Sequence, residues 1–146
     1  MTSRGKRNQT AQLSVQLLRE GIVESIHHVQ AVVCDNRGRM LSVAGHTEDS
    51  TFIRSALKPF QALAPLVTGT LERYNLTDRD LAIMCSSHQG TTEQARQVFN
   101  ILWHCDVDPS QLQCPVSSHQ TSPLEYNCSG KHAGMLAVCQ QRNWPL

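Results

Sequence analysis

The sequence feature that most constrains the fold is the segment Asp35-Asn36-Arg37-Gly38, which lies between two β-rich runs. The runs, residues 29–34 and 39–44, consist mainly of valine, alanine and other apolar residues. Asn and Gly in such a segment favour a hairpin turn, because both accept the left-handed backbone that tight turns need. The sequence therefore predicts an antiparallel β-hairpin over residues 29–44.

Downstream of this hairpin the spacing of apolar residues becomes helical. Residues 58–67 carry the first such pattern, which predicts a helix that starts near Ser55 and has Gly69 as its C-cap. Pro59 suits a first turn, because its missing N–H is not needed there. Pro65 falls inside the pattern, so we expect it to kink or end the helix.

Two further helices are predicted towards the C-terminus. The first covers about residues 92–104, where Thr91 and Gln94 have the spacing of a capping box. Residues 106–126 contain three prolines and many polar residues, which predicts a loop with at most one short helical turn. The last helix begins near residue 130 and runs towards Arg142. The apolar stripe of the 92–104 helix comprises Ala95, Val98, Phe99, Leu102 and Trp103.

The balance of charge excludes two classes of partner. The 13 Lys and Arg residues against 12 Asp and Glu give a net charge of +1, which offers no electrostatic attraction to nucleic acid or an anionic membrane. No run approaches the roughly 18 consecutive apolar residues of a membrane span. Arg4, Lys6 and Arg7 precede polar residues, unlike the start of a signal peptide. We therefore expect a cytoplasmic protein whose six cysteines are reduced and mostly buried.

A hydroxyl and an amine are spaced three residues apart at Ser55 and Lys58. On a helix, this spacing places both side chains on one face, where an amine kept neutral by burial can take the serine proton. The pair is then a candidate acyl-transfer site. The alternative is an N-cap serine followed by a solvated lysine, and the same spacing recurs at Ser3 and Lys6 in a polar segment.

Two other polar segments have a catalytic and a structural interpretation. Residues 86–90 contain Ser87 and His88, which could relay protons to the first pair or could form a turn that caps the next helix. Cys128 and Lys131 place a thiol and an amine one turn apart at a helix start, where the N-terminus favours a thiolate. Cys128 is therefore a candidate nucleophile or metal ligand, or else a buried cysteine beside a glycine turn.

Taken in order, the three segments resemble the asparaginase II family of the Rhizobium etli type. The resemblance extends from about Leu13 to the final residues, Asn143-Trp144-Pro145-Leu146, and includes the hairpin. The motifs that carry it are Phe52-Ile53-Arg54-Ser55-Ala56-Leu57-Lys58-Pro59-Phe60-Gln61-Ala62, Cys85-Ser86-Ser87-His88-Gln89-Gly90 and Asn127-Cys128-Ser129-Gly130-Lys131-His132-Ala133-Gly134-Met135.

The resemblance implies an α/β fold related to serine β-lactamases and glutaminases, and hydrolysis of L-asparagine to L-aspartate and ammonia. By this resemblance Ser55 is the nucleophile, Lys58 is the amine that activates it, and Ser87 is the serine of a second Ser-Lys pair. Cys128 and Lys131 match two ligands of a zinc site, to which a lysine can bind only as the free amine.

The remaining candidate residues lie inside the same motifs. Arg54, His88 and His132 are predicted to bind the substrate. The resemblance also implies family members of about twice this length, so residues 12–146 are expected to be the N-terminal part of the domain and residues 1–11 a polar tail. That part consists of a β-hairpin sheet followed by helices.

The shorter length bears on activity. By the resemblance, the lysine partner of Ser87 and a third zinc ligand, another cysteine, belong to the missing half. An exposed sheet edge is also expected. We therefore expect this chain to be weak or inactive alone, and to need a complementing C-terminal chain or to form a homodimer. Three alternatives stay open: a non-catalytic fragment or pseudoenzyme, a Ser-Lys hydrolase acting on another amide, and a thiol-based or zinc-binding module built on Cys128.

Overall fold

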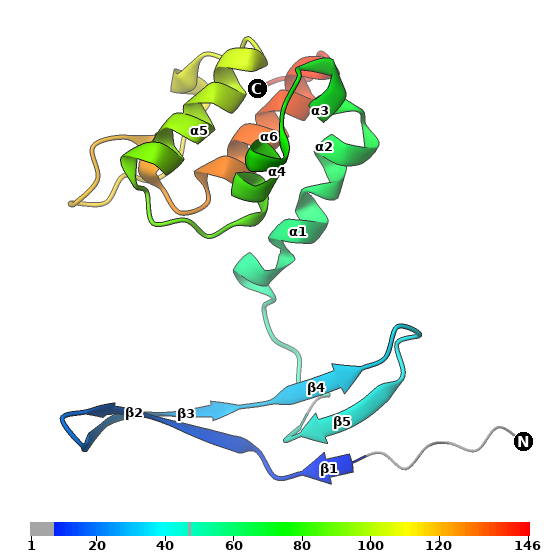
Figure 1. Ribbon diagram of the computed structural model, residues 1–146, viewed down its shortest axis with the longest axis vertical. Coiled ribbons are helices and arrows are strands. Elements are labelled where there is room, and N and C mark those ends of the chain that lie inside the picture. The colour runs from blue at the N-terminus through cyan, green and yellow to red at the C-terminus, as the bar shows by residue number, and fades with distance from the viewer. Residues whose placement is uncertain (1–7, 47) are drawn as a thin grey trace, which may run out of the picture. The chain divides into compact units, whose positions relative to one another are not determined.

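The computed structural model describes residues 8–46 and 48–146, and the chain separates into two compact units, residues 1–52 and 53–146. The first unit is built of β-strands and the second of helices (Figure 1). The chain is therefore mixed α/β, with the β-hairpin sheet first and the helices after it, as the sequence predicts. No helix among the described residues is both long enough and apolar enough to cross a membrane.

The predicted hairpin forms part of a three-stranded sheet in the order β1-β5-β4. Strands β4 (Ala31–Cys34) and β5 (Met40–Ala44) are antiparallel, which confirms the hairpin. The Asp35 carboxylate stabilises the turn, because it accepts the backbone N–H groups of Arg37 and Arg39, each at 2.9 Å. These bonds and the side chain of Arg39 hold the pKa of Asp35 below its usual value.

Strand β1 (Asn8–Thr10) pairs in parallel with β5, although residues 1–11 were predicted to be a polar tail. Ala11, the other residue of that tail with a described structure, lies outside any strand. The parallel pairing joins Asn8 to Ser42 and Thr10 to Ala44. Partners more than thirty residues apart leave no local signal in three polar residues, so the sequence pattern did not reveal this strand.

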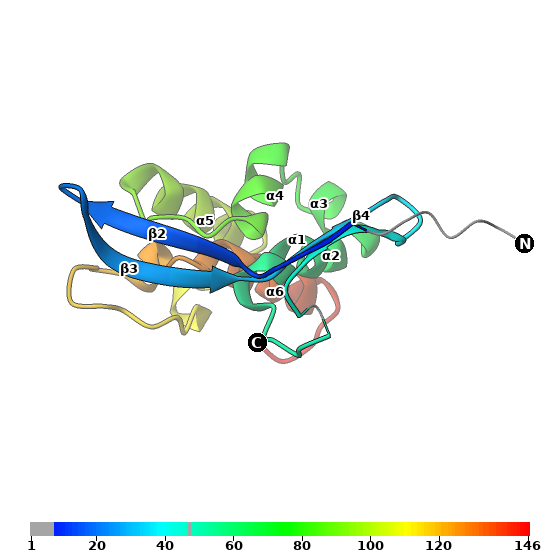
Figure 2. The same cartoon turned by 90° about the horizontal axis from the view of Figure 1, so that it is seen from below.

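A second antiparallel hairpin pairs β2 (Leu13–Arg19) with β3 (Ile22–Val29) as a long two-stranded ribbon (Figure 2). Glu20 and Gly21 connect the strands, and both have positive φ, as in the tight hairpin turns that match strand twist. The apolar side chains of this ribbon are exposed in the structure. They are Leu13, Val15, Leu17, Leu18, Ile22, Val23, Ile26 and Val29.

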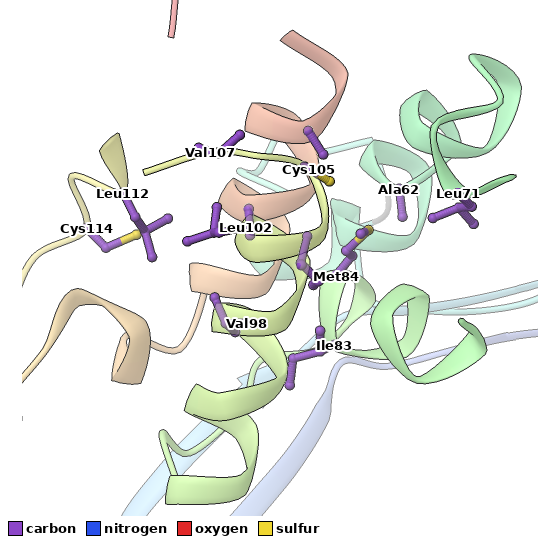
Figure 3. Close-up of a cluster of buried hydrophobic side chains, with 13 residues drawn as sticks. Ala62, Leu71, Ile83, Met84, Val98, Leu102, Cys105, Val107, Leu112 and Cys114 are labelled. Carbon is purple, nitrogen blue, oxygen red and sulfur yellow. The ribbon is translucent and has the colours of Figure 1, made fainter. Parts of the chain in front are cut away.

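The helical unit contains three principal helices, α4, α5 and α6, which pack on one another. Its elements are η1 (Arg54–Leu57), α1 (Lys58–Gln61), α2 (Leu63–Val67), α3 (Thr70–Arg73), α4 (Asp78–Cys85), α5 (Thr92–His104), η2 (Pro109–Gln111), η3 (Pro123–Glu125) and α6 (Ser129–Gln141). Its buried core is drawn in Figure 3 and comprises Ala62, Leu71, Ile83, Met84, Val98, Ile101, Leu102, Cys105, Val107, Leu112, Cys114, Ala133 and Ala137.

The helix predicted over residues 58–67 is divided in two at Ala62. Pro65 explains the division, because it has no N–H to donate to the carbonyl of Gln61 and its ring would clash with that group. Helix α1 accordingly ends at Gln61. Gly69 has a positive φ of 69°, as a C-cap glycine does, and α3 follows it directly.

Helix α5 has the predicted bounds and the predicted capping box. Gln94 N–H donates to Thr91 Oγ1 at 3.3 Å, and Thr91 N–H donates to Gln94 Oε1 at 3.0 Å. The predicted apolar stripe is only partly buried, because Trp103 is 72% exposed and stacks on Phe99 at the surface. The stripe that faces the core has the spacing i, i+3, i+4, i+7 and consists of Val98, Ile101, Leu102 and Cys105.

Helices α4 and α6 approach each other closely at two glycines of α6. A Cβ at Gly130 would overlap with the carbonyl oxygen of Ile83, and one at Gly134 would lie 2.7 Å from the sulfur of Met84. These glycines therefore allow the C-terminus of α4 to lie against the N-terminus of α6. The segment before α6 contains two short 3₁₀ turns, η2 and η3, one more than the sequence suggested.

Candidate functional site

Lys58, the first residue of α1, is buried with only 1% of its surface exposed. Its Nζ donates to the Ser86 carbonyl at 2.7 Å, to Ser87 Oγ at 2.8 Å and to the Asn127 carbonyl at 3.2 Å. The partners come from the end of α4, the loop after it and the loop before α6. Lys58 is therefore not the solvated lysine of the structural alternative. It belongs to the first predicted polar segment and forms hydrogen bonds with residues of the other two.

Lys58 forms no ion pair with a carboxylate of any described residue. The ion pairs found within residues 8–46 and 48–146 are Arg19–Glu24, Asp35–Arg39 and Arg79–Glu93. The three partners of Lys58 can serve both of its protonation states. An ammonium group offers three N–H donors, whereas a neutral amine donates to the two carbonyls and accepts the Ser87 hydroxyl on its lone pair. The geometry thus allows a proton to pass between Ser87 Oγ and Lys58 Nζ.

Ser55 lies in the 3₁₀ turn η1 and is exposed. Its side chain caps neither η1 nor α1, and its hydroxyl forms no hydrogen bond with Lys58 among the described residues. The bond between the two residues is a backbone one, in which the Lys58 N–H donates to the Ser55 carbonyl. Instead, the two side chains line one pocket of about 280 Å³. The full lining is Arg54, Ser55, Lys58, Gln61, Cys128 and Lys131. The pocket therefore brings together the first and third predicted segments.

Cys128 and Lys131 lie in the lining because α6 begins between them. Cys128 is the N-cap residue and Lys131 follows in the first turn, and both are half-buried. Burial raises the pKa of the nearby Cys114 thiol, Cys128 raises it further and Lys131 lowers it. Cys105, by contrast, is a buried core thiol whose pKa is raised to about 12 by burial and by Asp80.

The zinc site implied by the resemblance requires more ligands than this pair. Tetrahedral zinc normally takes three or four protein ligands. No group of three or more His, Cys, Asp or Glu side chains that could hold a metal occurs in the part of the chain that the structure describes. Cys128 and Lys131 supply two donors. Zinc binding by this pair therefore stays a prediction, and no step of the proposed reaction depends on zinc.

His88 is buried and is not part of the lining of this pocket. Gly90 N–H donates to its Nδ1 at 3.1 Å, so the ring proton is on Nε2, which lies 2.8 Å from Ser129 Oγ. Burial lowers the pKa of His88, and the charge of Lys58 lowers it further. Both ring nitrogens are thus used within the protein, and its predicted contact with substrate stays a prediction.

His132 is half-buried and lines a different pocket, of about 240 Å³. Burial lowers the pKa of this imidazole, and the charges of Lys131 and Lys58 lower it further. Arg54, the third residue predicted to bind substrate, does line the pocket that holds Ser55. Its backbone φ of 48° lies in the left-handed region, which non-glycine residues rarely adopt.

Four groups of the site were not assigned from the sequence. Gln61 lines the pocket, and Ser129 supports His88. The carbonyls of Ser86 and Asn127 hold Lys58. Gln61 and Ser129 lie inside the motifs that carry the family resemblance, so the sequence could have indicated them. Every residue has a backbone carbonyl, so the sequence gives no signal for the two carbonyls that bind Lys58.

The arrangement is that of a Ser-Lys site: a buried lysine amine bonded to one serine hydroxyl and sharing a basic pocket with another. A model of the L-asparaginase II family matches residues 15–146. The chain therefore belongs to the L-asparaginase II family, as its motifs predicted, and its class is that of the asparaginase-type amidohydrolases. No curated protein matches the sequence.

Proposed function

We propose that this chain provides the nucleophile and base of an L-asparagine amidohydrolase, which converts L-asparagine and water to L-aspartate and ammonia in the cytoplasm. The observation that carries this proposal is the buried Nζ of Lys58, 2.8 Å from Ser87 Oγ and in the lining of the pocket that contains Ser55. The proposal includes a fold related to the serine β-lactamases and glutaminases.

The first half of the reaction forms an acyl-enzyme. Ser55 Oγ attacks the side-chain amide carbon, and its proton passes to the neutral amine of Lys58. Lys58 then gives a proton to the leaving nitrogen, the C–N bond breaks and ammonia departs. Ser87, which is bonded to Lys58, serves as the hydroxyl through which protons enter and leave the amine.

The second half restores the enzyme. Water attacks the ester carbon and gives its proton to Lys58, and the ester C–O bond then breaks to release aspartate. Ser55 recovers its proton from Lys58, so no net proton is gained by the protein. Each step uses only the hydroxyls and the amine of the Ser-Lys site.

The pocket lining supports a substrate that carries a carboxylate group. Arg54, Lys58 and Lys131 are basic and none of the lining residues is acidic. Arg54 and Lys131 form no ion pair with another described residue, so their charges are available to a ligand. We propose that Arg54 holds the α-carboxylate of asparagine, for which a guanidinium offers paired donors.

The test is ammonia release from L-asparagine by the wild-type chain and by Ser55→Ala. Loss of a nucleophile of this kind lowers kcat by about 10³-fold or more. Ser117→Ala is the matched control, because Ser117 is an exposed loop serine outside the site. Equal rates for wild type and Ser55→Ala would reject the proposal. Glutamine, a peptide and a lactam are assayed in parallel to separate asparaginase from another Ser-Lys hydrolase.

We further propose that the chain alone has low activity and that a complementing C-terminal chain or a second copy raises it. The exposed apolar side chains of the β2–β3 ribbon support this, because contiguous exposed apolar surface often marks a contact with another polypeptide. The rate of ammonia release is measured against protein concentration. A full rate from the monomeric chain would contradict this part of the proposal.

A further inference from the structure

His88 connects two segments that supply the partners of Lys58. It directly follows Ser87 in the sequence, and its backbone N–H donates to the carbonyl of Asn127 at 3.2 Å. The same carbonyl accepts from Lys58 Nζ. His88 is therefore hydrogen-bonded to the Asn127 carbonyl, which accepts from Lys58, and is the sequence neighbour of Ser87, which also accepts from Lys58.

The imidazole of His88 is itself fixed at both nitrogens. Its Nδ1 accepts from Gly90 N–H, and its Nε2–H donates to Ser129 Oγ, whose hydroxyl donates to the Leu124 carbonyl at 2.7 Å. Ser129 is fully buried. The bonds form one directional series in which each donor has an acceptor, so rotation of the ring would leave buried groups unsatisfied.

The backbone on either side is equally constrained. Gly90 has a positive φ of 76°, and a Cβ there would overlap with the carbonyl oxygen of Glu125. The loop of residues 86–90 is thus pressed against residues 124–127. A side chain with a positioning role needs such support, because a loop free to move could not hold a hydroxyl at hydrogen-bond distance from an amine.

We propose that His88 is a positioning residue, which acts through Ser129 and the Asn127 carbonyl to hold Lys58 Nζ against Ser87 Oγ. This assigns His88, which is not in the pocket lining, a role other than direct contact with substrate. It rests on the proposed function only in taking Lys58 as the catalytic base. The hydrogen-bonded arrangement itself can be tested without any enzymatic reaction.

Two isosteric substitutions separate the two ring nitrogens. His88→Asn retains a group near the position of Nδ1 but loses the donor to Ser129, whereas His88→Gln retains a donor near the position of Nε2. Ser129→Ala removes the acceptor of that donor. His119→Asn is the matched control, because His119 makes a comparable contact with Ser117 in an exposed loop.

The first readout is the exchange of the Lys58 Nζ protons with water, followed by NMR of ¹⁵N-lysine-labelled protein. We expect slow exchange in wild type, exchange faster by about tenfold or more in His88→Asn and Ser129→Ala, and recovery in His88→Gln, because a lost buried bond increases access of water. Unchanged exchange in His88→Asn and Ser129→Ala would overturn the proposal. So would equal acceleration in His88→Gln, which would indicate general loosening of the loop.

The second readout is steady-state hydrolysis of asparagine with thermal unfolding measured on the same samples. We expect kcat to fall by about 10²-fold in His88→Asn with KM little changed, since a small misplacement of a base has that effect. A rise in KM with unchanged kcat would return His88 to substrate binding and overturn the proposal. If wild type releases no ammonia, the proposed function fails, while the exchange measurement still decides the role of His88.

Discussion

The β unit and the helical unit differ in where they place their apolar side chains. In the helical unit, thirteen buried residues from four helices and the intervening loops form a single core. In the β unit, only Val43 and Ala44 are buried hydrophobic residues among those described, and the β2–β3 ribbon exposes its apolar side chains. The comparison indicates that the helical unit, which contains the Ser-Lys site, also contains most of the buried apolar contacts that can fix the positions of the site residues.

Core truncation tests this comparison with the largest expected effect on stability. Leu102→Ala removes a fully buried side chain and should lower the free energy of unfolding by about 2–5 kcal/mol. Leu17→Ala removes a side chain that is 52% exposed in β2, and should cost less than about 1 kcal/mol. Urea unfolding followed by circular dichroism measures both. Similar losses of unfolding free energy in the two variants would contradict the proposed difference in packing between the two units.

Glycine substitution sharpens the same comparison at the backbone. Gly130→Ala would force a methyl group against the Ile83 carbonyl, and should destabilise the helical unit by about 1–3 kcal/mol. It should also slow hydrolysis, since α6 would move relative to the end of α4. Gly21→Ala meets no neighbouring atom and suffers only from its positive φ, at a cost of about 1 kcal/mol.

The reverse order of these two glycine effects would show that contact between α4 and α6 is looser than described. Thermal unfolding gives the stability, and ammonia release by the same samples shows whether the site is displaced.

Acid should destabilise the helical unit before the β unit. His88 and His132 have pKa values lowered from 6.5 by burial, so the unfolded chain binds their protons at a higher pH than the folded chain. Stability is therefore fully present above about pH 6.5 and is lost as the pH falls below it towards the folded pKa values. Urea midpoints between pH 7.5 and 5 measure the loss. The double variant His88→Gln/His132→Gln should flatten this dependence, and an unchanged slope would exclude these two imidazoles as its cause.

The smallest expected effect concerns metal. With two donors, Cys128 and Lys131, the chain should bind zinc weakly and lose it on dialysis, and Cys128→Ser should weaken the binding further. Cys34→Ser, a change at an exposed thiol of the β unit, should have no effect. Metal analysis after dialysis provides the measurement. One retained zinc per chain that persists in Cys128→Ser would show a different and complete site.

The sequence predicted the elements whose signals are local. The capping box at Thr91 and Gln94 and the turn at residues 35–38 depend on residues within one turn of each other, and both are observed. Strand β1 was not predicted, and the stripe predicted for α5 was right at Val98 and Leu102 but wrong at Phe99 and Trp103. Both outcomes depend on partners distant in the sequence. The position of Trp103 at the surface, in particular, is decided by what packs against the other side of the helix.

For the candidate site too, the sequence predicted the local motifs but not the contact between distant residues. Ser55, Lys58, Ser87, Cys128 and Lys131 were identified by motif, but the hydroxyl bonded to Lys58 was expected to be Ser55 and is Ser87. Lys58 and Ser87 are 29 positions apart in the sequence, and the bond depends on how α1 and α4 pack. No spacing rule within a helix can indicate such a pair.

The central claim is that Lys58 and Ser87 act as one unit in the reaction. A double-mutant cycle of ammonia release with Lys58→Met, Ser87→Ala and the double variant tests it most directly, since residues that act together are strongly non-additive. We predict that the double variant is no slower than Lys58→Met by more than about threefold. Multiplication of the two single effects in the double variant would contradict the account.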